Sequence, residues 1–498
     1  MEFVDRDLEL ELVTSYYKQS AKVMEAIAIY GNRGIGKTEL IKELSKRIKS
    51  LYFFVNEEKP TVQLIEEYAQ QLKDIGVLDK YATLKSWREF LDVLSRCDGY
   101  MVVFDEFQRF LDADRSIFSE LQNYLDSNKD KHMLMVFQGS SIGLMKKLFS
   151  DRKTPLYGRL ATTLRIGQLN IRVIGEMLSQ LGYDTTIENI FNAYALFGGY
   201  PVGYSLLERT PVSIKQTIRG LANTDAEEKG HFNPYLIAER MYGNKYAPLR
   251  TYLDNVLMQD FGKRRAVYYA ILEAIGSGET RIGGIAARVG IKTTSLPRYI
   301  KDLKDSLEYI GQISSIGYRG IGGKHSIYRI DNPLIDLWFR LVYRNMGLVD
   351  SAGLKMSYIK EVVGPFLGLR FESFVSDLIK NGLCRKEFAL EFTKVGKWWG
   401  KDPEKLKGKN EEEVDIVAIN EDTNDILFAE CKWTGEPVGI SLYKDLVRKA
   451  KLVQWHNEDR KEHYALFSRS GFTDEMKELA KREEVLLFDL EAIEKALK

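Results

Sequence analysis

The 498-residue chain has few cysteines and no long apolar run. Its three cysteines, Cys97, Cys384 and Cys431, are far apart and lack the spacing of a metal site, so we expect reduced, buried thiols in a cytosolic protein. A run of about 18 apolar residues, which a membrane-spanning helix needs, is missing. Residues 1–7 are acidic and lack the apolar centre of a secretory signal. These features predict a cytoplasmic protein without a membrane partner.

The chain also lacks an excess of charge of either sign. It has 72 Lys and Arg residues against 71 Asp and Glu residues, a net charge of +1. The overall charge therefore does not favour nucleic acid or a membrane surface, and any basic surface must be local. The 44% hydrophobic and 29% charged content is typical of globular proteins. A chain of this length is expected to form about three or four domains, each with its own core.

Residues 31–38 form the clearest motif, because they fit the phosphate-binding loop pattern G-x-x-x-x-G-K-[ST] without departure. An apolar strand over 26–30 is expected before it and an amphipathic helix over 39–48 after it. A glycine turn that matches by chance is the alternative, which this context disfavours. The predicted nucleotide-binding residues are Gly31, Asn32, Arg33, Gly34, Ile35, Gly36, Lys37 and Thr38. Lys37 is expected to contact the β- and γ-phosphates as a catalytic residue, and Thr38 to hold Mg²⁺.

A second apolar strand, over 100–104, runs directly into Asp105 and Glu106. An acid at the carboxyl end of a parallel strand lies where such sheets bind ligands. This pattern is typical of a Walker B motif, in which Asp105 is a Mg²⁺ ligand and Glu106 a general base that polarises the attacking water. The alternative is a strand that ends in a solvated acidic turn.

Two further segments offer weaker candidates. The strand expected over 133–137 leads to Gln138 and Ser140, which either sense the γ-phosphate or belong to a turn that caps the next helix. Arg159 is a candidate nucleotide-binding residue in the manner of an arginine finger, although a plain surface arginine explains its position equally well.

As a set, these motifs resemble the archaeal ATPase family, a branch of P-loop NTPases akin to the STAND and Orc-like AAA+ groups. The matching segments are residues 3–6 with Glu9 and Leu10, the phosphate loop, and residues 103–108, 139–141, 156–159 and 198–201. The resemblance implies ATP as the nucleotide and a helical lid over 169–262. It also implies that residues 3–4 and the turn at 198–201, including Pro201, flank the adenine, with Arg6 nearby.

The middle of the chain, residues 263–345, has the pattern of a winged helix-turn-helix. Helices are expected over 266–275, 281–289 and 296–309, followed by strands over 312–316 and 326–330 that a glycine-rich turn at 320–323 connects. The third helix carries basic residues that suit a DNA backbone and acidic residues that repel it: Arg298, Lys301 and Lys304 against Asp302, Asp305 and Glu308. Both DNA contact and a purely structural or partner-binding role stay open.

The C-terminal segment, residues 360–498, contains a second candidate site. Asp415 lies on one expected strand, and Glu430 and Lys432 lie on the same face of the next. Two carboxylates with a lysine suit a hydrolytic site in which a divalent ion, Mg²⁺ or Mn²⁺, activates water. Amphipathic edge strands with solvated charges are the alternative. On a helix expected over 367–380, Glu372 is a further acid.

These residues resemble the PD-(D/E)XK nuclease fold, which forms a C-terminal domain of undefined function in relatives of archaeal ATPases. The resemblance implies Glu372, Asp415 and Glu430 as metal ligands, and Asp415, Glu430 and Lys432 as catalytic residues. Val414 stands where the family pattern has a proline, which is a departure.

Together these patterns predict a multidomain α/β protein. Its expected parts are a P-loop parallel αβα ATPase core (1–168), the helical lid (169–262), the winged helix (263–345) and a restriction-endonuclease-like α/β domain (360–498). The leading hypothesis is an ATP-hydrolysing switch coupled to a metal-dependent DNA nuclease or nuclease-like DNA-binding domain, with homo-oligomer formation open. The alternative is a STAND-type, ATP-gated regulator whose C-terminal domain binds a partner without cleaving nucleic acid. The first hypothesis requires that Glu372, Asp415, Glu430 and Lys432 converge on one open cleft. Scattered carboxylates would favour the regulator.

Overall fold

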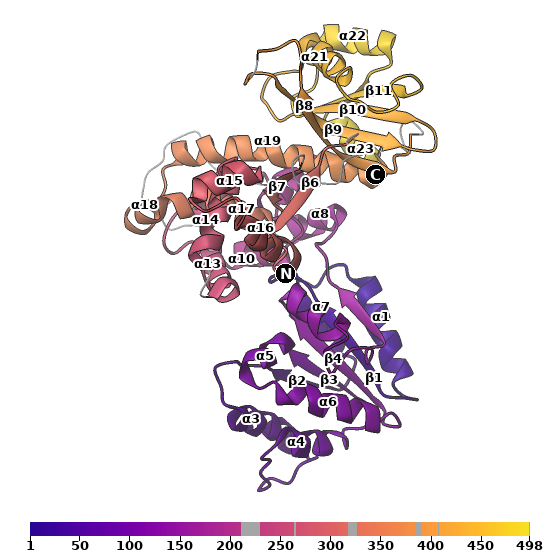
Figure 1. Cartoon of the computed structure of the whole chain (residues 1–498), viewed down its shortest axis with the longest axis vertical. Coiled ribbons are helices and arrows are strands. Elements are labelled where there is room, and N and C mark those ends of the chain that lie inside the picture. Colours follow the sequence, from indigo (N-terminus) through magenta and orange to yellow (C-terminus); the bar gives the residue numbers. More distant parts are fainter. Residues whose placement is uncertain (211–229, 263–264, 317–325, 384–389, 407, 498) are drawn as a thin grey trace. The chain divides into compact units, whose positions relative to one another are not determined.

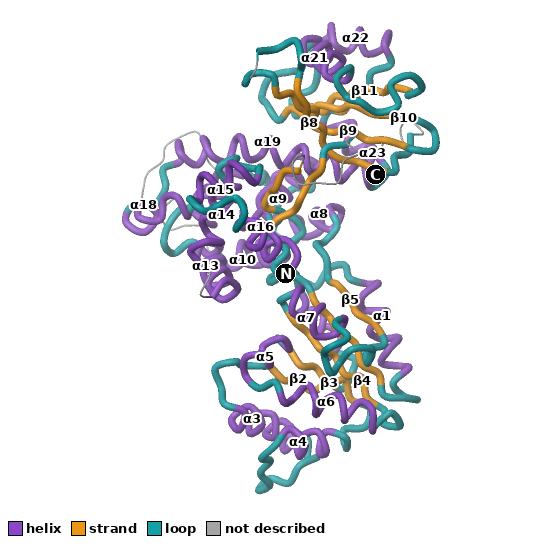
Figure 2. Tube along the Cα trace, in the orientation of Figure 1, coloured by secondary structure: helices purple, strands orange, loops and turns teal. Residues whose placement is uncertain are grey.

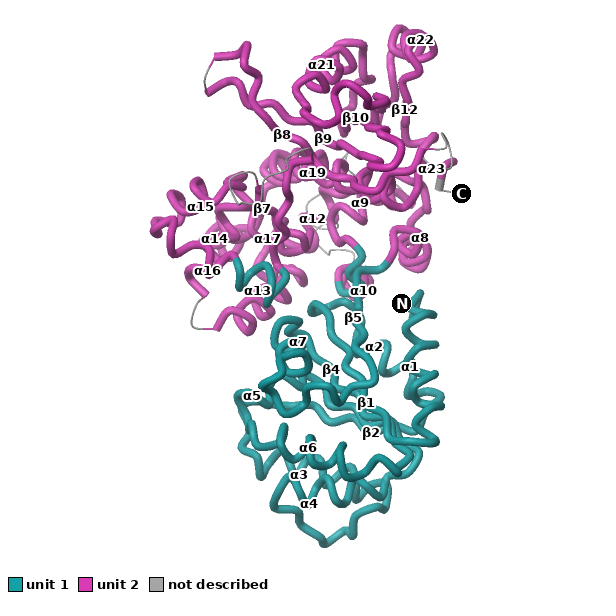
Figure 3. Tube along the Cα trace, turned by 45° about the vertical axis from the view of Figure 1, so that its right-hand side comes forward, with its two compact units in different colours: residues 1–169, 199–202, 301–308 teal, residues 170–198, 203–300, 309–498 magenta. Residues whose placement is uncertain are grey.

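The computed structural model describes residues 1–210, 230–262, 265–316, 326–383, 390–406 and 408–497 (Figure 1). The chain divides into two compact units (Figure 3). Unit 1 comprises residues 1–169, 199–202 and 301–308, and unit 2 comprises residues 170–198, 203–300 and 309–498.

Unit 1 is built on a parallel sheet (Figure 2). Its strands are β1 (Glu25–Tyr30), β2 (Ser50–Phe54), β3 (Tyr100–Asp105), β4 (Met133–Gly139) and β5 (Thr162–Arg165), in the order β2-β3-β4-β1-β5. Every residue of β1 and β4 is buried, which explains why these strands are almost entirely apolar. The parallel sheet confirms the expected α/β core.

The helices of unit 1 surround this sheet. They are α1 (Asp7–Gln19), α2 (Lys37–Ser45), α3 (Thr61–Asp74), α4 (Trp87–Leu94), α5 (Phe110–Ala113), α6 (Ser116–Ser127) and α7 (Ile142–Ser150), with a 3₁₀ turn, η1, over Phe107–Arg109. Helices α3, α4 and α6 lie side by side (Figure 1). Fully buried rings from β2, β3 and η1 join in one core beneath the end of β3, namely Phe53, Phe104 and Phe107. This packing fixes the backbone that presents Asp105 and Glu106.

Unit 2 begins with helices and a hairpin. The helices are α8 (Ile171–Gln180), α9 (Ile187–Phe197), α10 (Pro201–Arg209, whose first two residues belong to unit 1), α12 (Pro234–Tyr242), α13 (Pro248–Phe261), α14 (Arg265–Gly276), α15 (Ile282–Val289), α16 (Leu296–Lys301), α17 (Pro333–Leu341) and α18 (Met346–Ser351), with a 3₁₀ turn, η5, over Tyr343–Asn345. Strands β6 (Ile310–Ser314) and β7 (Ser326–Ile330) pair antiparallel. The expected glycine-rich turn at 320–323 lies outside the described residues.

The third helix of the middle segment is shorter than predicted. Helix α16 ends at Lys301 and continues as a π-helical turn, η3 (Asp302–Ser306), which belongs to unit 1. There η3 packs on α7 so closely that a Cβ on Gly143 would lie 2.4 Å from the Cα of Ser306. The last turns of this helix therefore pack against protein.

The C-terminal part of unit 2 combines a long helix with a mixed sheet. Helix α19 (Met356–Lys380) runs through Pro365, so it begins before the helix expected over 367–380. Burial of Ile359, Val363 and Phe366 on both sides of the proline offsets the lost backbone hydrogen bond. The sheet order is β12-β11-β10-β9-β8, with the strands β8 (Lys394–Lys401), β9 (Glu411–Asn420), β10 (Asp425–Lys432), β11 (Lys461–Ser468) and β12 (Leu486–Phe488). Helices α21 (Ile440–Ala450), α22 (Asp474–Glu483) and α23 (Leu490–Leu497) complete this part.

Cys97 and Cys431 are free and buried, as predicted, and Cys384 lies outside the described residues. Within the described ranges, no helix combines the length and apolarity that crossing a membrane requires.

Candidate functional site

The phosphate loop connects β1 to α2 and depends on its glycines. Gly34 and Gly36 have φ angles of 74° and 97°, in the left-handed region that favours glycine. A Cβ on Gly31 would lie 2.5 Å from the carbonyl oxygen of Ile166, so a larger residue does not fit there. The backbone of residues 31–36 can therefore curve tightly before α2 begins at Lys37.

Lys37 is buried and lies over the loop. Its ammonium group donates hydrogen bonds of 2.7 Å and 3.0 Å to the carbonyl oxygens of Gly31 and Asn32. Thr38 follows in the first turn of α2 with an exposed side chain. The loop amides, the ammonium group and the start of α2 are the donors that a polyphosphate requires.

The turn at residues 198–201 contacts the phosphate loop within unit 1. The Asn32 side chain donates a 3.3 Å hydrogen bond to the hydroxyl of Tyr200. The ring of Pro201 lies 3.7 Å from the position that a Cβ on Gly36 would occupy. The structure therefore brings this distant segment to the phosphate loop, and its expected place beside the adenine stays a prediction.

Two of the predicted arginines differ in their surroundings. The guanidinium of Arg6 donates hydrogen bonds to the carbonyl oxygens of Gly167, at 2.6 Å, and Ile35, at 3.3 Å. It therefore connects the backbone of the phosphate loop to the segment after β5. Arg159 instead forms an ion pair of 2.8 Å with Asp126 on α6. Its expected role at a nucleotide stays a prediction.

Asp105 is almost fully buried at the end of β3, and both of its oxygens accept hydrogen bonds. Gln138 on β4 donates to Oδ1 at 2.5 Å, and the hydroxyl of Tyr52 on β2 donates to Oδ2. Burial raises the pKa of Asp105. Tyr52 is in turn hydrogen-bonded to Thr38. The side chain of Tyr52 therefore connects the two expected Mg²⁺ ligands, Thr38 and Asp105. Hard oxygen donors of this kind suit Mg²⁺.

Glu106 has a φ angle of 54°, which is uncommon for a residue with a side chain. Its carboxylate accepts hydrogen bonds from Ser140, at 2.7 Å, and Gln108, at 2.5 Å, and lies 3.8 Å from the guanidinium of Arg33. Burial works against ionisation, but the charge of Arg33 and these hydrogen bonds outweigh it and lower the pKa of Glu106. An ionised carboxylate beside the phosphate loop suits a general base.

The C-terminal acids converge in unit 2. Asp415 on β9 and Glu430 on β10 come from neighbouring strands, and Glu372 comes from α19, which packs on this sheet. Oδ2 of Asp415 accepts a 3.0 Å hydrogen bond from the backbone N–H of Cys431. Burial, followed by the negative charge of Asp415, raises the pKa of Glu372 and of Glu430 to about 7. The three carboxylates therefore lie close enough to repel one another.

Lys397 on β8 lies among these acids, and the sequence interpretation did not assign it a role. Its ammonium nitrogen is 3.1 Å from Oε2 of Glu372, 3.2 Å from Oε2 of Glu413 and 4.0 Å from Oδ1 of Asp415. Burial opposes its charge, yet the carboxylates raise the pKa of Lys397 above its usual value.

A register shift explains why Lys397 reaches the cluster. Gly396 pairs with Val417, whereas Trp398 pairs with Val414, so two residues of β9 face the single Lys397 on β8. An irregularity of this kind re-aims side chains, and one of the two facing residues is Asp415. Single-sequence periodicity carries no signal for it.

Glu430 is surrounded by two further lysines. The ammonium nitrogen of Lys449 on α21 is 3.0 Å from Oε1, and that of Lys432 is 3.3 Å from Oε2. Lys449 also pairs with Asp445 at 3.1 Å. The adjacent Arg448 is likewise bound to acids, namely Asp402, Glu412 and Asp445.

In the part of the chain that the structure describes, no group of three or more His, Cys, Asp or Glu side chains is arranged to hold a metal ion. At the C-terminal cluster, lysine ammonium groups neutralise the carboxylates instead. At the nucleotide site such a group is not required, because Mg²⁺ usually binds one or two protein ligands together with phosphates and water. The donors at the nucleotide site therefore fit Mg²⁺ as they stand.

The end of the third middle-segment helix faces protein. Glu308 forms ion pairs within unit 1 with Lys146, at 3.2 Å, and with Arg165. Lys304 lies 3.6 Å from Asp305, and Arg298 packs on the ring of Tyr299. Of the three predicted DNA-contacting residues, Arg298 and Lys301 are exposed and Lys304 is half-buried.

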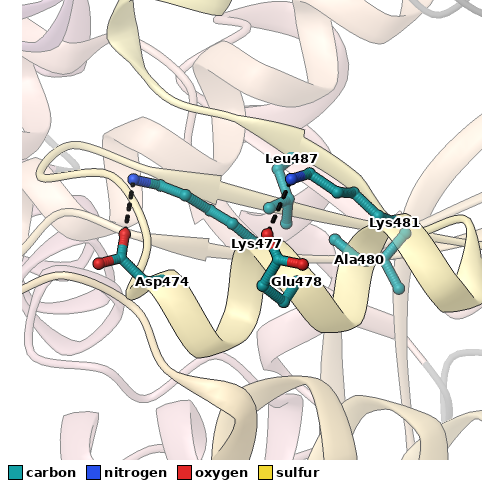
Figure 4. Close-up of a pocket in the computed structure, with 7 residues that line it drawn as sticks. Asp474, Lys477, Glu478, Ala480, Lys481 and Leu487 are labelled. Carbon is teal, nitrogen blue, oxygen red and sulfur yellow. Dashed lines mark hydrogen bonds and ion pairs between the residues drawn. The ribbon is translucent and has the colours of Figure 1, made fainter.

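Two cavities in unit 2 lie outside the predicted sites. One cavity, of 480 Å³, lies beside α22 and β12 (Figure 4). There Lys477 pairs with Asp474, and Lys481 pairs with Glu478 of the same helix. The other, of 600 Å³, lies beside β8 and β9 and is rich in glutamates, including Glu413. Its acidic lining disfavours phosphate groups.

Comparisons with known proteins match two parts of the chain. Residues 3–206 match a family model described as an ATPase domain predominantly from Archaea. Residues 338–445, which include all four predicted C-terminal residues, match a model described as archaeal and bacterial proteins of unknown function. The first match agrees with the archaeal ATPase domain expected in this part of the chain.

Individual relatives and solved structures are also similar to this chain. An uncharacterized protein of Methanocaldococcus jannaschii is 27% identical over 493 residues, which cover 98% of this chain and 99% of that protein. A Walker-type ATPase of Pyrococcus abyssi is similar in structure with a TM-score of 0.50 and 17% identity, over 68% of this chain and 96% of that one. The ORC2 protein of Aeropyrum pernix has a TM-score of 0.46 and 14% identity, over 74% of this chain and 94% of that one. The Pyrococcus structure supports the P-loop ATPase fold.

Proposed function

We propose that this protein is an ATP-hydrolysing switch whose nucleotide state controls a C-terminal nuclease-like domain. The observation that carries the ATPase half is the linkage of Thr38, on the phosphate loop, to Asp105 through Tyr52. It joins the two motifs that a Mg²⁺-dependent phosphoryl transfer requires. Bound Mg²⁺ neutralises the charge of the β- and γ-phosphates.

Each residue of the nucleotide site has its own role in ATP hydrolysis. The loop amides and Lys37 bind the phosphates, with Lys37 exchanging its carbonyl contacts for phosphate oxygens. Glu106, ionised beside Arg33, accepts a proton from the attacking water. Gln138 and Ser140 hold the two acids in orientation through their hydrogen bonds. The turn at 198–201 closes over the loop next to the adenine.

Helix α9 supports the coupling to the C-terminal domain. Its Phe191 ring lies 4.0 Å, centroid to centroid, from Trp433 and 5.3 Å from Phe371. Trp433 follows Lys432, and Phe371 precedes Glu372, so α9 packs beside the backbone of both candidate residues. The chain leaves α9 directly into the turn at 198–201, which contacts the phosphate loop in unit 1. A nucleotide that moves this turn therefore acts on α9.

For the C-terminal domain we infer a PD-(D/E)XK-like site that binds DNA and, once the lysines release its carboxylates, cleaves the DNA with Mg²⁺ or Mn²⁺. Support comes from the convergence of Glu372, Asp415 and Glu430, with Lys432 next to Glu430. The three helices and hairpin of the middle segment suit a winged helix, which would add DNA contacts through Arg298.

The ATPase proposal is tested with Lys37→Ala. Loss of the phosphate-binding ammonium should lower ATP turnover by at least about 100-fold. Lys42→Ala is the matched control, because Lys42 lies on the same helix, is exposed and pairs with the exposed Glu39. Turnover in Lys37→Ala equal to that of the control would contradict the proposal.

The nuclease proposal is tested with Asp415→Asn and Lys432→Ala. Mn²⁺-dependent cleavage of single- and double-stranded DNA by the wild-type protein should disappear in both variants. Lys394→Ala is the control, because it removes an exposed residue of β8 that pairs with Glu421. This variant should cleave DNA at the wild-type rate. Cleavage that survives in both site variants would point to a different site.

A STAND-type regulator that does not cleave nucleic acid is the second candidate. The specific observation in its favour is that lysines neutralise Glu372 and Glu430 in this structure. The two candidates differ in one result: the regulator binds DNA or a protein partner in an ATP-dependent way, yet leaves DNA intact at any Mn²⁺ concentration.

A further inference from the structure

Tyr52 lies on β2, a strand outside the sequence motifs of the nucleotide site. Strand β2 pairs in parallel with β3, and Phe54 is the register partner of Asp105. Tyr52 is two residues earlier on β2, so its side chain points to the same face of the sheet as that of Phe54. A long side chain at this position reaches the carboxyl end of β3, and its hydroxyl donates to Oδ2 of Asp105.

The Tyr52 hydroxyl also accepts a hydrogen bond from Thr38. A phenol has one proton to donate and lone pairs to accept with, and both functions are used here. The result is an ordered chain in which Thr38 donates to Tyr52 and Tyr52 donates to Asp105. Tyr52 is thus placed between the two side chains that the motifs assign to Mg²⁺.

The other oxygen of Asp105 is held from the opposite side. Oδ1 accepts hydrogen bonds from the Gln138 side chain, at 2.5 Å, and from the backbone N–H of Glu106, at 2.9 Å. Because both oxygens are held, the carboxylate cannot rotate freely. Tyr52 is the partner that fixes Oδ2 and connects it to the phosphate loop.

We propose that Tyr52 is a positioning residue for the Mg²⁺ that accompanies ATP, an inference that rests on the proposed ATP site. The Thr38 oxygen can offer a lone pair to a cation when its hydrogen points away, and the Tyr52 oxygen accepts the hydrogen bond from that hydroxyl. The proton of Tyr52 in turn orients Asp105. Residues that orient metal ligands in this way typically change metal affinity by 10–100-fold when they are removed.

The test is Tyr52→Phe in the full-length chain, which keeps the ring and removes only the hydroxyl. Tyr68→Phe is the matched control, because its hydroxyl donates to the carbonyl oxygen of Phe54, at 2.9 Å, in the same domain. Binding of ADPNP, a non-hydrolysable ATP analogue, is measured by calorimetry in EDTA and across a Mg²⁺ titration. Thermal unfolding of each variant checks the fold.

In Tyr52→Phe, the Mg²⁺ concentration that gives half of the increase in ADPNP affinity should rise about 10-fold. ADPNP affinity in EDTA should match that of the wild type, and Tyr68→Phe should resemble the wild type in both measurements. An unchanged or lower Mg²⁺ midpoint in Tyr52→Phe would overturn the inference while leaving the ATP site intact. A wild-type protein that binds no ADPNP would instead remove the proposed function itself.

Discussion

The ammonium group of Lys397 lies 3.1 Å from the carboxylate of Glu372, with Glu413 and Asp415 on its other sides. A buried cation that serves several acids cannot be removed without leaving their charges unbalanced.

Lys397→Met should lower the free energy of unfolding by about 3 kcal/mol, because it leaves Glu372 and Asp415 without their shared cation. Added Mn²⁺ should restore more stability to this variant than to the wild type, since the carboxylates then have a vacant cationic position. Urea unfolding with and without Mn²⁺ measures both effects. Lys394→Met on the same strand removes only an exposed ion pair and should change stability by about 0.5 kcal/mol or less. Equal losses in the two variants would contradict the role of Lys397.

The C-terminal cluster should make stability depend on pH. Burial and the charge of Asp415 raise the pKa of Glu372 and Glu430 from 4.5 to about 7 in the folded chain. The folded state therefore holds more protons than the unfolded chain between these values. The free energy of unfolding should fall as pH rises from about 5 to about 8, by about 1–3 kcal/mol.

Glu430→Gln removes one of the two groups and should flatten this pH dependence. Urea unfolding at several pH values, followed by tryptophan fluorescence, measures the slope. Glu421→Gln, an exposed change on the same domain, should keep the wild-type slope. The prediction fails if the two variants show the same dependence.

Glu106→Gln should bind ATP but hydrolyse it about 100-fold more slowly or worse, because an amide cannot accept the proton of the attacking water. The amide can still accept hydrogen bonds from Ser140 and Gln108, so the fold should be kept. Single-turnover hydrolysis together with ATP-analogue binding separates the two steps. Turnover near the wild-type rate would exclude Glu106 as the general base.

Gly199→Ala should disturb the turn that contacts the phosphate loop. A Cβ at this position would lie 2.3 Å from the carbonyl oxygen and 2.6 Å from the nitrogen of Leu169, and a backbone neighbour cannot move aside cheaply. Weaker ADPNP binding and a lower melting temperature are expected. Gly167→Ala, where the added Cβ meets no atom within 4 Å, is the control and should behave as the wild type. Normal nucleotide affinity in Gly199→Ala would show that the turn does not support the site.

Sequence reasoning predicted the parts of the site that are contiguous in the chain. The phosphate loop, Asp105 and Glu106 each follow a buried strand, so a local pattern sufficed. Tyr52 carried no such signal, because its role depends on β2 lying beside β3 rather than beside β1, and this pairing connects distant residues.

The C-terminal cluster shows the same limit. The positions of Asp415, Glu430 and Lys432 follow from alternation along their strands, but Lys397 enters through a register shift between β8 and β9. The helix expected over 367–380 extends back through Pro365, because burial of the flanking apolar residues outweighs the local preference of proline in α19. Local rules fail where tertiary packing supplies the larger free energy.

The sheet order of unit 1 places β4 between β1 and β3. The strand that leads to the phosphate loop and the strand that ends at Asp105 are therefore two inter-strand spacings apart, roughly 10 Å. Backbone hydrogen bonds between the strands, which do not depend on the side chains, set this separation of β1 and β3. Side chains at the edge of the sheet can consequently change without altering the space in which a phosphate and a water molecule must meet.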